Sequence, residues 1–179
     1  MSGGQRRPGA EEKAARVRLF LIDVDGVLTD GTIFLDNNGV EGKGFNIMDG
    51  LALTLLQKAG VPAGIITGRD SNVVTTRARE LGLEILVQGC TAKLPAAREI
   101  AEQRGLTLEQ VAYVGDDLID IALLKHAGLA VSVPNGAPEA HARAHHVTGP
   151  PGGRGAVREV CELILKAQGK WDDIVARYQ

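Results

Sequence analysis

The amino-acid sequence predicts an α/β fold built as a doubly wound parallel sheet. Short apolar runs alternate with helical patterns along most of the chain, as in strands joined by crossover helices. The first run, residues 19–22, is apolar at every position, which is typical of a strand buried on both faces. The 23 glycines among 179 residues indicate many tight turns.

Composition favours a single globular domain of ordinary size. Twenty basic and 22 acidic residues give a net charge of −2, so charge alone draws the chain to neither nucleic acid nor anionic lipid. Cys90 and Cys161 form no metal-ligand spacing and no disulfide framework, which favours a reduced cytoplasm. No apolar run reaches the roughly 18–20 residues that span a bilayer, and the N-terminus lacks the apolar core of a signal peptide. We therefore expect a cytoplasmic protein with no nucleic-acid or membrane partner.

Residues 1–16 are polar and predict a flexible N-terminal tail, with room for one helical turn at 10–15. The folded domain is expected to cover 17–179, beginning with a strand at 17–24. A β-hairpin is predicted at about 32–46, where 32–35 and 43–46 flank the turn residues 36–39. Its apolar residues Ile33, Phe34, Leu35 and Phe45 exceed what one small sheet can bury, so we expect a subunit contact there.

The rest of the chain alternates regularly. Strands are expected at 61–67, 84–87, 111–115, 129–133 and 145–148, and helices at 49–59, 70–81, 91–104, 118–126 and 137–143. Gly60, Gly82 and Gly105 provide helix stops. After a Pro-Pro-Gly-Gly break, a C-terminal tail of about 150–179 begins with an amphipathic helix at 155–167. The pattern shows no repeat and no second domain.

Uncommon polar residues follow four of the predicted strands. Because the carboxyl ends of parallel strands meet at one edge, these side chains are expected to share one crevice. Carboxylate oxygens select magnesium, and hydroxyl and ammonium groups donate to phosphate oxygens. The set comprises Asp23 and Asp25 after the first strand, Thr67 after the second, Lys93 after the third, and Asp116 with Asp117 after the fourth.

The Asp23–Asp25 pair taken alone is more typical of a polar turn after a strand. Side chains alternate along a strand, so these two point the same way until the backbone turns. Two carboxylates held this close repel each other, and a cation or a proton must relieve the repulsion. The later motifs favour the cation.

In the order DVDGVLTDG, ITGR, Lys93 and GDDLID, these motifs resemble those of the haloacid dehalogenase (HAD) superfamily of phosphatases. The short gaps between the motifs leave no room for a cap domain. The chain therefore resembles the capless branch and, within it, the phosphatases of 3-deoxy-D-manno-octulosonate 8-phosphate (KDO 8-phosphate). The likeness extends to NNG at 37–39, FN-x-x-DG at 45–50 and GGRGAVREVCELIL at 152–165. It implies a HAD-like Rossmannoid fold, a homotetramer joined by the hairpins, and a place in lipopolysaccharide precursor synthesis.

The resemblance also implies a role for each motif residue. Asp23 would be the nucleophile that forms an aspartyl-phosphate. Asp25 would protonate the leaving sugar alkoxide and later deprotonate the attacking water. Mg²⁺ would be bound by the carboxylates of Asp23 and Asp116 and the backbone carbonyl of Asp25. Two sets complete the site: Asp117 or Asp120 for the metal-bound waters, and Thr67 with Lys93 for the phosphoryl oxygens.

Further residues are implied as contacts of the sugar phosphate. Arg69 and Arg77, expected two turns apart on one helix, would face an anionic substrate. Met48 stands where close relatives are expected to carry Arg. A neighbour's C-terminal tail would place Arg154 over the site in place of a cap. The whole implied set is Asn46, Ile47, Met48, Asp49, Gly50, Thr54, Arg69, Arg77, Lys93 and Arg154.

Three other functions stay open. A phosphatase of a related sugar phosphate, such as a nonulosonate 9-phosphate, would share every motif, although those relatives tend to carry an acidic residue where Arg69 stands. A phospho-receiver domain uses the same residue types, but its acidic pair comes early and its Lys last. A non-catalytic partner module usually belongs to a longer chain, and here the acid and the metal ligands are intact.

Overall fold

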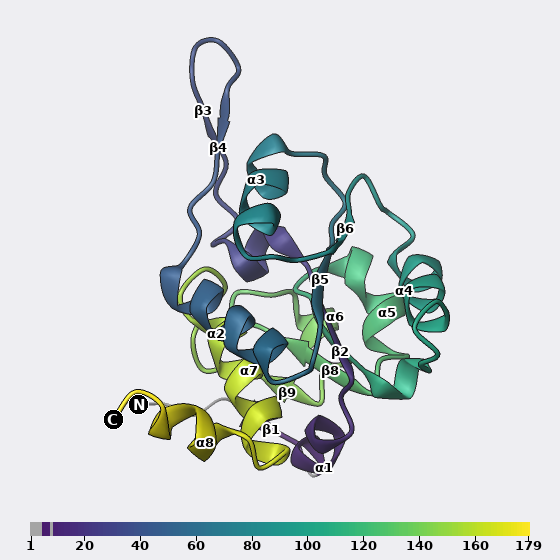
Figure 1. Cartoon of the computed structure of the whole chain (residues 1–179). Helices are drawn as coiled ribbons and strands as arrows, with labels where there is room; N and C mark the ends of the chain where they lie inside the picture. Colours follow the sequence, from purple (N-terminus) through teal and green to yellow (C-terminus); the bar gives the residue numbers. More distant parts are fainter. Residues whose placement is uncertain (1–4, 8) are drawn as a thin grey trace.

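A seven-stranded sheet forms the centre of the protein (Figure 1). The computed structural model describes residues 5–7 and 9–179. Its strand order is β1-β9-β8-β7-β2-β5-β6, with β1 antiparallel to β9 and the other six strands parallel. The strands are β1 (Gln5–Arg6), β2 (Leu19–Ile22), β5 (Ala63–Ile66), β6 (Ile85–Val87), β7 (Val111–Val114), β8 (Leu129–Ser132) and β9 (His146–Val147). The predicted doubly wound parallel sheet is confirmed.

Helices cover both faces of this sheet and bury two hydrophobic cores. Phe20 and Ile22 of β2 pack into one core, and Leu19 and Leu21 into the other, because successive side chains of a strand point to opposite faces. One core is covered by α1 (Ala10–Ala15), α2 (Ile47–Lys58), α3 (Asn72–Glu80), α7 (Ala156–Ala167) and α8 (Trp171–Ala176). The other is covered by α4 (Lys93–Glu102), α5 (Ile121–Leu124) and α6 (Pro138–His141).

The described residues of the N-terminal segment, 5–7 and 9–16, belong to the folded structure, and the helical turn predicted at 10–15 is present as α1. Within it, β1 extends the sheet and α1 packs against α7. Ala10 and Ala14 of α1 are buried, and as residues four apart they share one helix face. Their small side chains let α1 lie close to α7, although they give only a weak apolar signal in the sequence. Residues 1–4 and 8 lie outside the described chain.

The predicted hairpin is present, but its second strand lies earlier than expected. β3 (Phe34–Leu35) pairs with β4 (Glu41–Gly42), so residues 43–46 lead into α2 and do not belong to the hairpin ladder. Figure 1 shows the hairpin projecting from the end of the molecule that lies away from α1 and α8. Phe34 and Leu35 are 63% and 68% exposed.

Two predicted helices also differ from the structure. The expected helix at 118–126 is a 3₁₀ turn at Leu118–Asp120 followed by the single-turn α5. The helix expected at 70–81 begins at Asn72, so Arg69 precedes it and does not share a helix with Arg77. In the described part of the chain, no helix is both long and apolar enough to cross a membrane.

Replacement of Ala14 by Asp tests whether α1 is part of the folded core. Ala14→Asp places a carboxylate against α7, and we expect it to reduce the free energy of unfolding by about 3–5 kcal/mol, the cost of an uncompensated buried charge. The thermal midpoint should then fall by about 6–20 °C. Ala15→Asp, at an exposed position of the same helix, is the matched control and should stay near the wild type. Equal midpoints for the two variants would show that α1 does not dock.

Candidate active site

Asp23 directly follows β2, an interior strand between β7 and β5, and is only 6% exposed. Its Oδ1 accepts a hydrogen bond of 2.7 Å from the backbone N–H of Val24. Its Oδ2 lies 2.8 Å from the ammonium nitrogen of Lys93, the first residue of α4. The carboxylate is therefore fixed at both oxygens.

Lys93 connects two buried carboxylates. Its Nζ donates to Asp120 Oδ1 at 2.7 Å, and the lysine itself is 2% exposed. Burial alone would lower the pKa of Lys93, but the charges of Asp23 and Asp120 outweigh it and raise that pKa above its ordinary value. The ammonium therefore keeps its proton and stays available to an anionic group.

Asp120 orients its neighbours. Its Oδ1 also accepts a hydrogen bond of 2.5 Å from the hydroxyl of Tyr113, a fully buried residue of β7. Its Oδ2 accepts the backbone N–H groups of Asp116 and Asp117 at 2.9 and 3.1 Å. Burial and the charge of Asp120 raise the pKa of Tyr113 well above its usual value, so the phenol remains a donor. Since both oxygens of Asp120 have protein partners, we assign it a positioning role.

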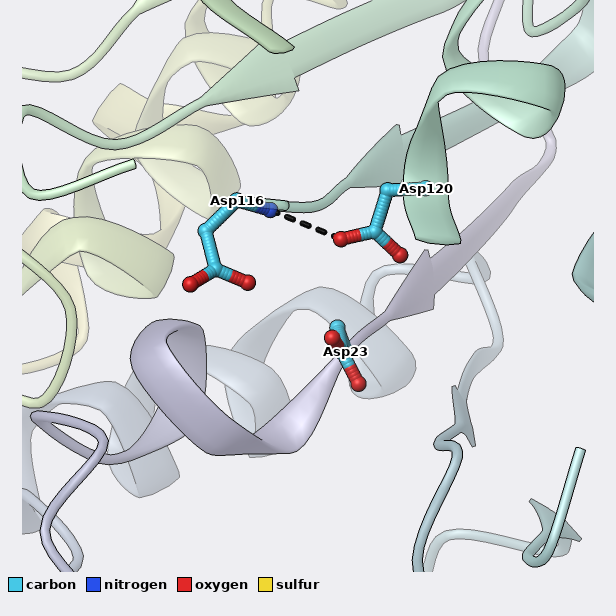
Figure 2. A group of neighbouring side chains, drawn as sticks. All are labelled: Asp23, Asp116 and Asp120. Carbon is cyan, nitrogen blue, oxygen red and sulfur yellow. Dashed lines mark hydrogen bonds between the residues drawn. The ribbon is translucent and has the colours of Figure 1, made fainter. Parts of the chain in front are cut away.

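Asp23 and Asp116 face a common space, with Asp120 beside them (Figure 2). One carboxylate oxygen from each of the three lies within 4.8 Å of the others. Burial and then the charge of Asp23 raise the pKa of Asp116 to about 7. The pKa of Asp23 rises to about 6 through burial, against the lowering effect of Lys93. A hard divalent cation would offset the cost of burying these carboxylates and relieve the repulsion between them. The oxygens of Asp23 and Asp116 are suitable ligands for such a cation.

Gly26 permits this approach of the two loops. A Cβ atom at position 26 would lie 2.0 Å from Asp116 Oδ2, and Gly26 has a φ of 85°. A side chain there is therefore excluded both by contact and by backbone conformation. Asn135, which sequence reasoning missed, supports the same loop: its Nδ2 donates to Gly26 O at 2.9 Å, and its Oδ1 accepts from Gly152 N–H at 2.8 Å. The Pro-Asn-Gly stretch indicates only a turn in the sequence.

Thr67 lies at the same edge of the sheet. The register pairs Ile22 of β2 with Ile65 of β5, so Thr67 comes one position beyond the level of Asp23. It is 2% exposed, and its backbone carbonyl accepts from Cys90 N–H at 2.9 Å. Asp117 is exposed, and its side chain caps the following turn by accepting from Leu118 N–H at 2.7 Å.

Asp25 lies two residues after Asp23, where the backbone turns beyond β2, and its carboxylate has partners of its own. Its Oδ1 contacts the ammonium of Lys43, and its Oδ2 lies 3.7 Å from Arg69 Nε. Sequence reasoning placed Arg69 near the site but missed Lys43, which it read as a hairpin strand residue. The acid pair therefore reaches two different partners, Lys93 and Lys43.

A cleft of about 400 Å³ lies between the end of the hairpin and the glycine-rich segment that precedes α7. Three of the predicted substrate residues line it. Asn46 caps α2 through Met48 N–H at 2.7 Å, Ile47 is 81% exposed, and Arg154 lies 3.6 Å from Asp30. The lining residues are Asp30, Gly44, Phe45, Asn46, Ile47, Gly153 and Arg154.

Four other predicted substrate residues do not line this cleft and instead make contacts within the protein. The buried carboxylate of Asp49 accepts the N–H groups of Gly155 and Arg158 at 3.3 and 2.7 Å, which ties α2 to the start of α7. Gly50 leaves space for Arg77, since a Cβ there would lie 2.3 Å from Arg77 Nη2.

Arg77 in turn stacks over the ring of Phe45 and pairs with Glu80 at 2.8 Å. The hydroxyl of Thr54 donates to Gly50 O within α2 at 3.1 Å, and Met48 is half-exposed. Substrate contact by these residues stays a prediction.

Comparison with known proteins agrees with the geometry. Residues 70–158 match the haloacid dehalogenase-like hydrolase family. A curated 3-deoxy-D-manno-octulosonate 8-phosphate phosphatase of Salmonella typhimurium is 45% identical over 170 residues, 95% of this chain and 90% of that protein. The enzyme of the same name from Escherichia coli K12 is 47% identical over 161 residues, 90% of this chain and 86% of that protein.

Solved structures give the same result. The crystal structure of the phosphatase of that name from Moraxella catarrhalis, in complex with magnesium, phosphate and KDO, matches with a TM-score of 0.95. It is 44% identical and covers 97% of this chain and 100% of its own. The cobalt-bound enzyme from Haemophilus influenzae matches with a TM-score of 0.85 at 36% identity, over 88% of this chain and 92% of its own.

The raised carboxyl pKa values predict how stability depends on pH. The pKa of Asp116 is raised to about 7 and that of Asp23 to about 6 in the folded chain, against an ordinary aspartate pKa of 3.8. Between these values the folded state binds more protons than the unfolded state, so stability falls as the pH rises. We expect the thermal midpoint of protein freed of divalent cations to decrease from about pH 5 to about pH 8.

Asp116→Asn should remove most of that decrease, and a saturating divalent cation should stabilise the wild type more at the higher pH, because it then meets charged ligands. A metal-free midpoint that decreases equally in the wild type and in Asp116→Asn would contradict this assignment.

Proposed function

We propose that this chain, which belongs to the 3-deoxy-D-manno-octulosonate 8-phosphate phosphatase family of haloacid dehalogenase-like hydrolases, releases phosphate from KDO 8-phosphate. The observation that carries the proposal is the buried Asp23–Lys93 pair beside Asp116. It offers a fixed nucleophile, a cation for the phosphoryl oxygens and oxygen ligands for a metal. The choice of KDO 8-phosphate as the substrate rests on the phosphatases of that name, which match this chain over nearly its full length.

In the first half-reaction, a carboxylate oxygen of Asp23 attacks phosphorus. The new oxygen–phosphorus bond forms as the bond to the sugar oxygen breaks, and Asp25 gives its proton to that oxygen. In the second, Asp25 takes a proton from water, the water oxygen attacks phosphorus, and the bond to Asp23 breaks. The products are the free sugar acid and inorganic phosphate, and both aspartates return to their starting states.

We assign Mg²⁺ to the carboxylates of Asp23 and Asp116 and the backbone carbonyl of Asp25. When bound, it neutralises charge on the transferring phosphoryl group. Asp117 or Asp120 would hold the metal-bound waters, and Thr67 and Lys93 would hold phosphoryl oxygens. Lys93 suits this task because its ammonium is already held at the nucleophile.

The sugar acid is proposed to lie in the cleft between the hairpin and the glycine-rich segment. Asn46 and Ile47 line the cleft, and Arg154 provides a cation for the sugar carboxylate. Arg69, about half-exposed beside Asp25, is a second candidate cation. Met48, on the first turn of α2, stands where Arg is expected in close relatives, so a related sugar phosphate is kept as the alternative substrate.

We further propose a homotetramer assembled through the hairpins, in which a neighbour's C-terminal segment closes the site. The exposed Phe34, Leu35 and Val40 on the hairpin support the contact, since apolar groups exposed together favour association. We also propose that the enzyme acts in the cytoplasm, in the synthesis of lipopolysaccharide precursors, as the relatives that act on KDO 8-phosphate suggest.

Kinetic assays with Mg²⁺ test the reaction. Asp23→Asn should abolish phosphate release because no other carboxylate takes its place. Asp25→Asn should slow it by about 10²–10⁴-fold, the usual contribution of a general acid and base. The panel should include KDO 8-phosphate, a nonulosonate 9-phosphate and simple hexose phosphates. A much larger kcat/KM for another member of the panel would overturn the substrate, and full activity of Asp23→Asn would overturn the mechanism.

Light scattering tests the assembly. Leu35→Asp puts a charge on an exposed apolar position of β3, and we expect it to dissociate the tetramer. Asn38→Asp, at the exposed tip of the hairpin, is the control and should leave the mass unchanged. A monomeric wild-type protein would refute the proposal.

A further inference from the structure

Lys43 lies at the base of the hairpin, just after β4, and has no role in the two half-reactions proposed for Asp23 and Asp25. Its side chain is fully removed from solvent, although its backbone is partly exposed. A buried lysine next to an active site needs an explanation, because an ammonium taken out of water costs free energy unless it is paired.

The partners of Lys43 are both acidic. Its ammonium contacts Asp25 Oδ1 and lies 3.3 Å from Glu41 Oε1. Asp25 is the proposed acid and base of the reaction and sits on a turn after β2. Lys43 therefore joins the hairpin to the catalytic carboxyl group.

We propose that Lys43 is a positioning residue that holds the Asp25 carboxyl group where it can transfer a proton to and from the substrate, an inference that rests on the phosphoryl transfer proposed above. The side chain of Asp25 is 24% exposed and sits on a turn, where a free carboxylate would rotate. Proton transfer requires it to stay within hydrogen-bond reach of the leaving oxygen. The contact at Oδ1 leaves Oδ2 for the proton, since Arg69 Nε is 3.7 Å from Oδ2, beyond hydrogen-bond distance.

A second layer of contacts holds Lys43 in place. Glu41 accepts the hydroxyl of Ser71 at 2.8 Å and an N–H of Arg69 at 3.1 Å. Ser71 and Arg69 belong to the loop between β5 and α3, so the base of the hairpin is tied to a different edge of the site. This brace fixes Glu41, and Glu41 with Asp25 fixes the ammonium.

Direct substrate binding by Lys43 is the competing explanation, and burial argues against it. With no solvent-exposed side-chain surface, Lys43 offers no face to a sugar arriving from water. A purely stabilising role is also disfavoured, because buried ion pairs contribute little net stability compared with apolar groups of the same size. Lys43→Met nearly keeps the length of the side chain and removes its charge, so this variant separates these roles.

The experiment compares two leaving groups at saturating Mg²⁺. The first substrate is the sugar phosphate that the wild type hydrolyses fastest, whose alkoxide leaving group needs a proton. The second is 4-nitrophenyl phosphate, whose phenolate leaves without one; its single-turnover rate with excess enzyme reports the first half-reaction alone. Lys58→Met, which removes an exposed lysine of α2, is the matched control.

For Lys43→Met we expect kcat with the sugar phosphate to fall about 10–100-fold, part of the range for a general acid. KM and the single-turnover rate with 4-nitrophenyl phosphate should stay within about 3-fold, because neither depends on Asp25 as an acid. Equal losses with both substrates, or a raised KM with unchanged kcat, would overturn the inference. If Lys43→Met does not fold, Lys43→Arg is judged by the same ratio of losses.

A double-mutant cycle gives an independent result. In the Asp25→Asn background, Lys43→Met should change the rate with the sugar phosphate by less than about 2-fold, because residues that act as a unit are not additive. A full further loss would overturn the inference. An error in the preferred sugar would be visible in the wild-type panel alone, whereas an error about Lys43 is visible in the ratios between variants.

Discussion

The buried ammonium of Lys93 is the interaction on which the rest of the site depends. It lies between Asp23 and Asp120, both almost fully removed from water. Without it the carboxylates of Asp23 and Asp120 would lose their shared ion-pair partner while lying close to Asp116, at a cost of several kcal/mol. Asp120 also accepts hydrogen bonds from the hydroxyl of Tyr113 and from two backbone N–H groups. β7 and the turn after it therefore fix Asp120, and Asp120 in turn positions Lys93.

The topology of the sheet makes this arrangement possible. β2 lies between β5 and β7, so the residues that follow these strands reach one edge although they are far apart in the sequence. This part could be predicted: apolar runs and motif types indicate the four strands and the polar residues after them, and the structure brings Asp23, Lys93 and Asp116 together. Continuous apolar strands and strand-end carboxylates are strong signals, because burial on both faces leaves few alternatives.

Other parts could not be read in this way. Lys43 and Asn135 act through their positions after folding, and nothing in a Gly-Lys-Gly or a Pro-Asn-Gly stretch distinguishes them from ordinary turn residues. Tyr113 looks like a core residue of an apolar strand, and only its hydroxyl contact with Asp120 gives it a further role. The helical turn at 10–15 could be predicted, but its packing against α7 could not, because buried alanines contribute little to an apolar pattern.

The interior position of β2 between β5 and β7 also matters while the chain is being synthesised. β2 leaves the ribosome before β5 and long before β7. Its four apolar residues are therefore synthesised before either of the strands that pair with β2. Pairing between segments this distant is slow to form and leaves apolar surface open to aggregation in the meantime. A nascent chain that ends before Asp120 also lacks the last member of the charged cluster. Partial products are thus expected to depend on chaperones and to be catalytically silent.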